Sequence, residues 1–397
     1  MKNSQIVIVD DSPAILLVMK GMLSELGYDN VVTCSHPASA LANIKRSPEK
    51  YSAVFTDLNM PEIDGMTLIK ELGEMNYRGG ICIISDMEKR VIELAAHLAR
   101  EHKVNLIGNI AKPVHINELQ RILNKIKQFT IRENQSYEPI SQSMLSDYMS
   151  KGMIEPYYQP KVNLQSRHVE GIEVLARIVT PGQTNAIAPG QFIPTAIEHG
   201  MLNELTQQLV GKVLTDFPML IKEFGKEVKV SLNLSPSQLT TDGYTRDFIE
   251  TIDTQHVDKN NITLEITEEF ALEDTEQLET INRLRMRGFG LSLDDFGTGF
   301  TNLNQLRTLP FTEVKIDRTL INDIHQDQFN QVVVDTLVNI AGKIDASLIA
   351  EGLEEYEDLE YLSKTYKDMN VQGYLICKPK PLDSLLYWHH SWLYNVQ

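Results

Sequence analysis

Two groups of acidic residues in this sequence stand where they could bind divalent cations. The first group joins acids to a hydroxyl and an amine, and its members are Asp10, Asp11, Asp57, Ser85 and Lys112. Each ends or follows a short apolar run typical of a buried strand, and a parallel sheet would bring such ends to one edge. Three carboxylates at one edge repel one another unless a hard cation such as Mg²⁺ lies between them. A lysine and a hydroxyl nearby suit a phosphoryl group, so a phosphate-handling pocket is expected.

The second group is larger and lies in the remainder of the chain. Most of its members stand at or just beyond the end of a predicted strand, and they are Glu173, Asn233, Glu265, Glu268, Asp294, Asp295, Lys315, Asp317, Glu351, Glu354 and Gln372. Converging carboxylates cannot all stay ionised in a low dielectric, so bound cations are expected. Oxygen ligands without clustered His or Cys favour Mg²⁺ or Mn²⁺ over Zn²⁺. Two such ions about 3.5–4 Å apart form the usual clamp for phosphodiester hydrolysis, and Lys315 could orient the nucleophile or neutralise phosphate oxygens.

Strand-end acids have a simpler explanation, because they commonly cap the following helix or remain solvated. For any single member of the first group, helix capping and phosphate handling are equally good explanations. Capping is a poor explanation for five such residues that occur in this order. Glu357 and Asp358 are expected to be ordinary caps or surface charges. The consecutive Asp294 and Asp295 end an apolar strand and are expected to bind metal. The glycine-containing residues 296–299 behind them predict a mobile loop that orders around a site.

The elements that would position the first group alternate regularly. Strands are predicted over residues 5–10, 30–35, 52–57, 80–85 and 105–110. Helices are predicted over residues 13–26, 37–47, 65–75, 88–101 and 115–128. Five such repeats predict an α/β domain over 1–128, with a doubly wound parallel sheet. Residues 129–142 lose the periodicity and contain Pro139, so they are expected to form a linker.

Residues 143–397 have the length of a single (β/α)₈ barrel, in which catalytic residues stand at the carboxyl ends of the strands. Strand candidates are the segments HVEGIEVLARIV, VKVSLNLS, ITLEIT, GLSLDDF, EVKIDR, ASLIAEG and VQGYLI. A TIM-like barrel is the expected fold. A large doubly wound sheet would produce a similar pattern and stays open on periodicity alone.

Composition excludes several protein classes. The chain has 397 residues, with 42% hydrophobic and 23% charged, which is typical of globular proteins rather than disordered or collagen-like ones. Three scattered cysteines form neither a disulfide framework nor a CxxC metal site, so a reducing compartment is expected. No apolar run approaches the ~18 residues of a membrane helix, and the N-terminus has the pattern of a buried strand rather than a signal peptide. We expect a cytoplasmic protein without a membrane partner.

The formal net charge of −17 is unevenly distributed. Residues 1–139 hold 16 Lys+Arg and 17 Asp+Glu, whereas residues 140–397 hold 21 and 37. Such acidity argues against nonspecific binding to duplex DNA, which depends on basic residues at phosphates. No basic recognition helix follows the first domain, so DNA binding is not predicted. A phosphate-bearing substrate remains possible if metal ions supply positive charge.

The first group resembles the receiver domain of two-component response regulators. The resemblance rests on Asp10-Asp11, Asp57 with Met60-Pro61 and Asp64-Gly65, Ser85, and Lys112-Pro113. It implies that Asp57 accepts phosphate from a sensor histidine kinase, that Asp10 and Asp11 hold one Mg²⁺, and that Ser85 and Lys112 sense the phosphoryl group. Two positions depart from the pattern. Asp86 replaces a small residue, and Asn109 replaces an aromatic one, so the signal is expected to run through the helix over 115–128.

The second group resembles the EAL phosphodiesterases of cyclic di-GMP turnover. Eight motifs carry the resemblance, in order QPKV, EVLAR, SLNLSPSQL, LEITEE, LDDFGTGFTNL, VKIDR, AEGLE and QGYLICKP. Val174 replaces the usual Ala of the signature triplet, Ile197 replaces an acid and Glu355 replaces a Thr; all three changes are expected to be minor because none falls on a metal ligand.

This second resemblance implies a role for each matching residue. One metal would be held by Glu173, Asn233, Glu265 and Asp294. Asp295 and Glu351 would serve the second metal, with Asp294 bridging. Lys315 would help to activate the attacking water, Glu268 would anchor the loop over 295–301, and Gln372 would contact water or substrate. Gln159 and Arg177 would bind the dinucleotide.

The combined expectation is a response regulator that hydrolyses cyclic di-GMP to linear 5′-pGpG with Mg²⁺ or Mn²⁺, modulated by phosphorylation of Asp57. Because no metal ligand is missing, an active enzyme is preferred over a non-catalytic cyclic di-GMP receptor that signals through protein contacts. Since EAL barrels often dimerise, a homo-oligomer is expected, a dimer or a larger assembly.

Overall fold

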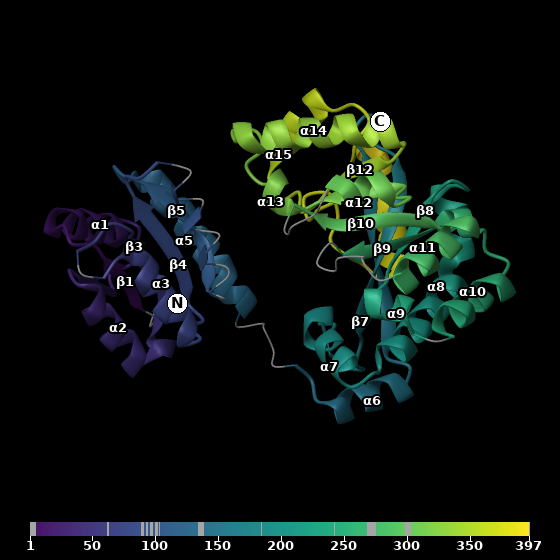
Figure 1. Cartoon of the computed structure of the whole chain (residues 1–397), viewed down its shortest axis with the longest axis horizontal. Helices are drawn as coiled ribbons and strands as arrows, with labels where there is room; N and C mark the ends of the chain where they lie inside the picture. Colours follow the sequence, from purple (N-terminus) through teal and green to yellow (C-terminus); the bar gives the residue numbers. More distant parts are fainter. Residues whose placement is uncertain are drawn as a thin grey trace. The chain divides into compact units, whose positions relative to one another are not determined.

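The structure is a computed structural model of the whole chain. It describes residues 5–396, except residues 62, 89–90, 93, 96–97, 100–101, 103, 134–138, 184, 242, 268–274 and 298–302. The chain divides into two compact units, residues 1–137 and residues 138–397 (Figure 1). Among the described helices, none is long and apolar enough to span a lipid bilayer.

The first unit is built on a five-stranded parallel sheet. Its strands are β1 (Gln5–Val9), β2 (Val31–Cys34), β3 (Tyr51–Asp57), β4 (Gly80–Ser85) and β5 (Asn105–Ala111). The strand order is β2-β1-β3-β4-β5, and every pair is parallel. This arrangement confirms the doubly wound sheet that the sequence predicts.

Helices cover both faces of this sheet because successive strand residues point to opposite sides. They are α1 (Pro13–Glu25), α2 (Pro37–Arg46), α3 (Gly65–Glu74) and α5 (Ile116–Glu133), with a short 3₁₀ helix, η1 (Pro48–Lys50). Val7 and Val9 of β1 pack in the core with residues of α2 and α3, whereas Ile6 and Ile8 pack in the core with residues of α1 and α5. The described residues between 91 and 99 are helical, as predicted.

Helix α5 continues to Glu133, so the helical backbone extends into the segment that the sequence assigns to a linker. Its polar C-terminal residues hide the helical period.

The second unit is a closed eight-stranded barrel. Its strands are β6 (Ile154–Asn163), β7 (Val169–Ile178), β8 (Lys229–Asn233), β9 (Ile262–Thr267), β10 (Gly290–Phe296), β11 (Glu313–Ile316), β12 (Ser347–Ala350) and β13 (Asn370–Val371). They close in the order β10-β11-β12-β13-β6-β7-β8-β9. Closure excludes the open doubly wound sheet and confirms the barrel.

The first barrel strand differs from the expected pattern. The sequence patterns predict no strand over 154–163, yet β6 forms there and runs antiparallel to both β7 and β13. Only five residues separate β6 from β7. A parallel crossover needs a dozen or more residues, whereas antiparallel neighbours need only a short turn. The short connection therefore fixes the reversed direction of β6.

Helices surround the barrel. They are α6 (Gln142–Ser150), α7 (Ile193–Glu198), α8 (Leu202–Phe224), α9 (Pro236–Leu239), α10 (Tyr244–Thr254), α11 (Thr275–Met286), α12 (Leu303–Thr308), α13 (Arg318–Ile321), α14 (Gln328–Ile344), α15 (Tyr356–Thr365) and α16 (Leu382–Val396), with 3₁₀ helices η2 (Pro189–Gln191) and η3 (Lys259–Asn261).

The interior of the barrel is polar. On β9, Ile262, Leu264 and Ile266 belong to the apolar core, whereas the alternating Thr263 and Glu265 are buried polar residues. The same alternation recurs around the barrel, where the buried polar residues include Lys161, Glu173, Ser231, Ser292, Asp294, Glu313 and Lys315. Barrel interiors are usually filled by branched apolar side chains, so this polar lining indicates a site rather than a packing core.

Candidate functional site

The acids of the first unit meet at the carboxyl edge of its sheet. Asp10 and Asp57 are buried, and Asp11 is exposed. One carboxylate oxygen of each lies within 4.8 Å of those of the other two. Lys112 Nζ lies 2.8 Å from Oδ2 of both Asp10 and Asp57. The order β1-β3-β4-β5 produces this meeting, because the predicted residues end or follow neighbouring strands.

This pocket has unused capacity for a ligand. Asp57 Oδ1 is buried and has no hydrogen-bond partner in the described part of the chain, and such an oxygen is costly unless a ligand satisfies it. Burial works to lower the pKa of Lys112, but hydrogen bonds and charges of Asp10 and Asp57 outweigh it and raise the pKa. The amine therefore stays charged where an anion would arrive.

The other predicted pocket residues lie on the same side of the sheet. Ser85 ends β4 and is buried, and its Oγ accepts a hydrogen bond from the Met87 amide at 3.2 Å. The two unusual residues, Asp86 and Asn109, are both exposed. A Cβ at Gly65 would lie 2.1 Å from the Asp57 carbonyl oxygen, so glycine allows helix α3 to begin against the end of strand β3.

The second group gathers around a single lysine in the barrel. Lys315 on β11 is almost fully buried, and its ammonium contacts four carboxylates, three on strands β7, β9 and β10 and one directly after β12. The distances from Nζ are 2.8 Å to Glu351 Oε1, 2.9 Å to Asp294 Oδ1, 3.1 Å to Glu265 Oε2 and 3.6 Å to Glu173 Oε2. One positive charge cannot neutralise four acids, so the cluster carries an excess of buried negative charge.

Burial and the crowding of acids raise the pKa of several carboxyl groups in the cluster. Burial and neighbouring acids raise the pKa of Glu173 and Asp294 above the ordinary range despite the charge of Lys315. Burial raises the pKa of Glu351 to about 8. Burial, reinforced by Asp294, raises the pKa of Asp295 to about 6. Divalent cations would remove the repulsion and return these groups to the ionised form.

Glu265 behaves differently from its neighbours. Burial would raise its pKa, but the charges and hydrogen bonds of Lys161 and Lys315 outweigh burial and lower the pKa to about 2. Glu265 is therefore an ionised oxygen donor even before any cation arrives.

A three-acid group lies at the outer part of the cluster. Asp294, Asp295 and Glu351 each offer an oxygen within 4.8 Å of the other two. An all-oxygen set of this size fits a hard divalent cation such as Mg²⁺ or Mn²⁺. The chemistry of the donors therefore fits the metal that the sequence predicts.

Amide side chains hold Glu173 in place. Asn233 Nδ2 donates to Glu173 Oε1 at 3.2 Å, and Gln372 Nε2 donates to Glu173 Oε2. Gln372 Nε2 also donates to Gln159 Oε1 at 3.1 Å, and Gln159 Nε2 donates to the Cys377 carbonyl oxygen at 2.9 Å. Gln372 Oε1 is buried without a partner in the described residues, so it can accept a hydrogen bond from water or substrate.

Arg177 lies near the carboxyl end of β7. Its guanidinium lies 5.7 Å from the centre of the Tyr157 ring and donates to the Ala176 carbonyl oxygen at 2.8 Å. Burial lowers its pKa, with Tyr374 and Tyr157 opposing. A partly buried guanidinium at this end of the barrel suits a phosphate or carboxylate.

Other predicted residues have different roles, although Asp317 lies close enough to Asp295 for its charge to help raise the pKa of Asp295. Asp317 caps helix α13 by accepting a hydrogen bond from the Thr319 amide at 2.8 Å, and Glu354 is exposed. Asp358, expected to be a cap or surface charge, is buried and accepts from the amides of Asp323 and His325. Glu268 and most of the loop over 295–301 lie outside the described residues.

The sequence patterns overlook one residue of the cluster, Lys161. It belongs to the QPKV motif, but a lone lysine in a segment without a predicted strand gives no signal of its burial. In the structure its place is shown by its contacts, among them a hydrogen bond of 2.7 Å from Lys161 Nζ to Glu265 Oε1.

Family models match both units. The EAL domain model matches residues 142–379, and the response regulator receiver domain model matches residues 6–124. The first of these covers more than half of the chain.

Two relatives illustrate the extent of the similarity. The cyclic di-GMP phosphodiesterase RocR of Pseudomonas aeruginosa is 25% identical over 385 residues, which cover 96% of this chain and 97% of RocR. The probable cyclic di-GMP phosphodiesterase PdeG of Escherichia coli is 32% identical over 247 residues, or 62% of this chain and 48% of PdeG. The similarity to RocR thus spans both units, and the chain matches about half of PdeG.

Solved structures resemble a large part of the chain. The phosphodiesterase PaMucR, in a cyclic di-GMP complex, is 28% identical with a TM-score of 0.56, covering 61% of this chain and 97% of that one. The EAL enzyme Bd1971, with cAMP and cyclic di-GMP bound, is 27% identical with a TM-score of 0.57, covering 76% of both chains.

Proposed function

The chain belongs to the EAL domain family and carries a response regulator receiver domain, and from this we infer that it is a cyclic di-GMP phosphodiesterase. We propose that it hydrolyses one phosphodiester bond of cyclic di-GMP and releases linear 5′-pGpG. The observation that carries this proposal is the set of four acids that contact Lys315 inside the barrel. RocR, similar along nearly the whole chain, bears the name of the same activity.

The cluster supports a two-cation site. Glu173, Asn233, Glu265 and Asp294 would hold one Mg²⁺ or Mn²⁺, and Asp295 and Glu351 the other, with Asp294 shared. When bound, the two ions supply a nucleophile at neutral pH and stabilise the charge that develops on phosphate oxygens. The acids converge at one end of the barrel, which agrees with the position of active sites in this architecture.

The other polar residues would bind the substrate and orient the attacking water. Lys315 would hold the attacking water by a hydrogen bond from its ammonium, and Gln372 Oε1, which has no partner among the described residues, would accept a hydrogen bond from that water. Arg177 would bind a substrate phosphate, and Gln159 would contact the dinucleotide while it supports Gln372. Glu268 would anchor the loop over 295–301.

Control by phosphorylation is a further part of the proposal. Asp57 would accept the phosphoryl group from a sensor histidine kinase, while Asp10 and Asp11 hold one Mg²⁺. Lys112 and Ser85 would bind the phosphoryl oxygens. The buried Asp57 Oδ1, which has no partner among the residues that the structure describes, lies beside a charged lysine and supports this assignment. The signal would pass from the receiver at 1–128 through the segment 129–142 to the EAL domain at 143–397, or change the assembly of a homo-oligomer.

Chromatography tests the activity. The chain with Mn²⁺ or Mg²⁺ should convert cyclic di-GMP to pGpG, and Glu173→Ala should not. Binding of cyclic di-GMP without any pGpG would instead identify a non-catalytic receptor. Equal rates and equal oligomer size with and without a phosphoryl mimic at Asp57 would contradict the regulatory part alone.

A further inference from the structure

Lys161 on β6 is a buried cation inside the barrel. It is 1% exposed, and its ammonium donates three short hydrogen bonds. The acceptors are Ser231 Oγ at 2.8 Å, Glu265 Oε1 at 2.7 Å and Glu313 Oε1 at 2.7 Å. All three donor positions of the ammonium are therefore used, which fixes its location.

Glu265 is shared between two lysines. Its Oε1 faces Lys161, and its Oε2 lies 3.1 Å from Lys315 Nζ. The charged groups form a continuous series through the barrel, in the order Glu313, Lys161, Glu265, Lys315. Only Oε2 of Glu265 remains on the side where the other acids of the cluster lie.

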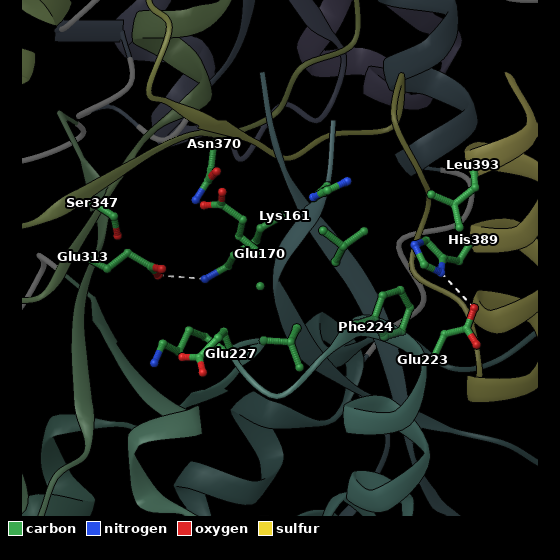
Figure 2. Close-up of a pocket in the computed structure, with 15 residues that line it drawn as sticks. Lys161, Glu170, Glu223, Phe224, Glu227, Glu313, Ser347, Asn370, His389 and Leu393 are labelled. Carbon is green, nitrogen blue, oxygen red and sulfur yellow. Dashed lines mark hydrogen bonds and ion pairs between the residues drawn. The ribbon is translucent and has the colours of Figure 1, made fainter. Parts of the chain in front are cut away.

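Lys161 comes from the end of the barrel opposite the acid cluster. Lys161 and Glu313 line a cavity of about 630 Å³, together with residues at the starts of strands β7, β8, β12 and β13 (Figure 2). Figure 2 shows the ion pair between Lys161 and Glu313 among these residues. Among the acids of the cluster Lys161 touches Glu265, so its direct contact with the site runs through Glu265, while its charge also works to lower the pKa of Glu173.

Packing alone gives no reason for these charges. Three buried ionised groups carry a desolvation penalty that apolar residues of similar size would avoid, and barrel interiors usually contain such apolar residues. A role in metal binding would explain the charges, because the ligands of a metal ion are held in orientation by hydrogen bonds from neighbouring residues. Lys161 would be such a neighbour for the carboxylate of Glu265.

We propose that Lys161 is a positioning residue that makes Glu265 a one-oxygen metal ligand. By occupying Oε1, it leaves Oε2 as the single oxygen that Glu265 offers to a cation. This inference rests on the proposed function, because it assumes that the cluster binds divalent cations.

The test measures metal binding directly. Mn²⁺ is titrated into the full chain, and free Mn²⁺ is followed by electron paramagnetic resonance. All variants carry Asp11→Asn, so that the receiver pocket binds little Mn²⁺ and the signal reports the barrel. The variants are K161M, E313Q and the charge-balanced double variant K161M/E313Q.

The double variant removes one positive and one negative charge, so the net charge near the site is unchanged. We expect it to weaken one barrel Mn²⁺ site by about 10–100-fold, the usual effect of losing an outer-shell partner. E313Q keeps the contact between Lys161 and Glu265 and should bind Mn²⁺ like the parent. K161M alone makes the site more negative, so tighter binding would indicate a pure charge effect and would overturn the proposal.

The outcomes distinguish a failure of the proposed function from a failure of the proposed role of Lys161. Parent chain that binds no Mn²⁺ in the barrel contradicts the proposed function. Parent chain that binds Mn²⁺, with unchanged affinity in K161M/E313Q, overturns the role of Lys161 alone. If thermal melting shows that the double variant does not fold, K161Q/E313Q replaces it. The amide introduced at position 161 can still donate one hydrogen bond to Glu265. A smaller but measurable loss of Mn²⁺ affinity is therefore expected.

Discussion

Asp294 and Asp295 are consecutive residues of β10, yet both offer an oxygen to the same cluster with Glu351. Successive residues of a regular strand point to opposite faces. The pairing of β10 with β11 shifts register between Leu293 and Phe296, and Asp295 has a φ of 58°. This irregularity turns both carboxylates inward, a known use of bulges beside active sites.

Gly297 should be essential for this turn. Its φ is 111°, and a Cβ there would lie 2.5 Å from Leu320 Cδ1. We expect Gly297→Ala to displace Asp295 and to lower kcat for cyclic di-GMP by about 10²-fold, the scale of a misplacement near 1 Å. Gly342→Ala on α14 is the matched control, because a Cβ there meets nothing within 4 Å. Equal rates for the two variants would contradict the importance of the turn.

Lys315 should stabilise the metal-free barrel. With Lys315→Met the four acids lose their shared cation, and the free energy of unfolding should fall by about 3–5 kcal/mol, as when a buried pair loses one partner. Urea denaturation in EDTA measures this. Lys364→Met removes an exposed helical pair and should change stability by less than about 0.5 kcal/mol. Saturating Mn²⁺ should restore part of the loss in Lys315→Met; no gain with Mn²⁺ would contradict a cation site at the cluster.

Stability of the metal-free chain should fall as pH rises. Burial raises the pKa of Glu351 to about 8 and of Asp295 to about 6, above their values in an unfolded chain. At a pH between its unfolded and its folded pKa, each of these groups binds more protons in the folded chain than in the unfolded chain. The free energy of unfolding therefore decreases as pH rises. The stabilisation present near the ordinary carboxyl range is lost as pH rises through about 6 and then about 8.

Urea denaturation across this range, with EDTA, measures the effect. Glu351→Gln should flatten the upper part of the slope, and excess Mn²⁺ should flatten all of it. Stability that is constant or increases with pH in EDTA would show that these carboxyls are already ionised.

Asp57 should be the single residue of the first unit that accepts a phosphoryl group. Treatment with acetyl phosphate and Mg²⁺ should add the mass of one phosphoryl group, and Asp57→Asn should abolish it because the neighbouring acids lie on other elements. Asp64→Asn is the control, since Asp64 is exposed and caps α3 through the Thr67 amide. Labelling that survives in Asp57→Asn would place the acceptor elsewhere.

Most of the fold could be predicted from the sequence. The strands of the first unit are short apolar runs separated by amphipathic helices, and that alternation has one common solution, the doubly wound sheet. Strand β6 escaped prediction because Pro156, Pro160 and Lys161 interrupt its apolar pattern. Its reversed direction depends on the short connection to β7, which a pattern of strands alone does not reveal.

The candidate site was predictable in composition but not in geometry. Glu173, Glu265 and Glu351 could be named from the sequence because each lies in a recognisable motif, EVLAR, LEITEE and AEGLE. The bulge at Asp295 and the burial of Lys161 could not, because each depends on strand register and on partners that lie far away along the chain.

The most direct test of the central claim is hydrolysis in ¹⁸O-labelled water. The chain with Mn²⁺ should convert cyclic di-GMP to pGpG with one ¹⁸O in its 5′-phosphate, as attack by water at phosphorus requires. Glu173→Ala and EDTA-treated chain should form no pGpG. Absence of product from the metal-loaded chain, or equal labelled product from Glu173→Ala, would contradict the assignment of the Lys315 cluster as a phosphodiesterase site.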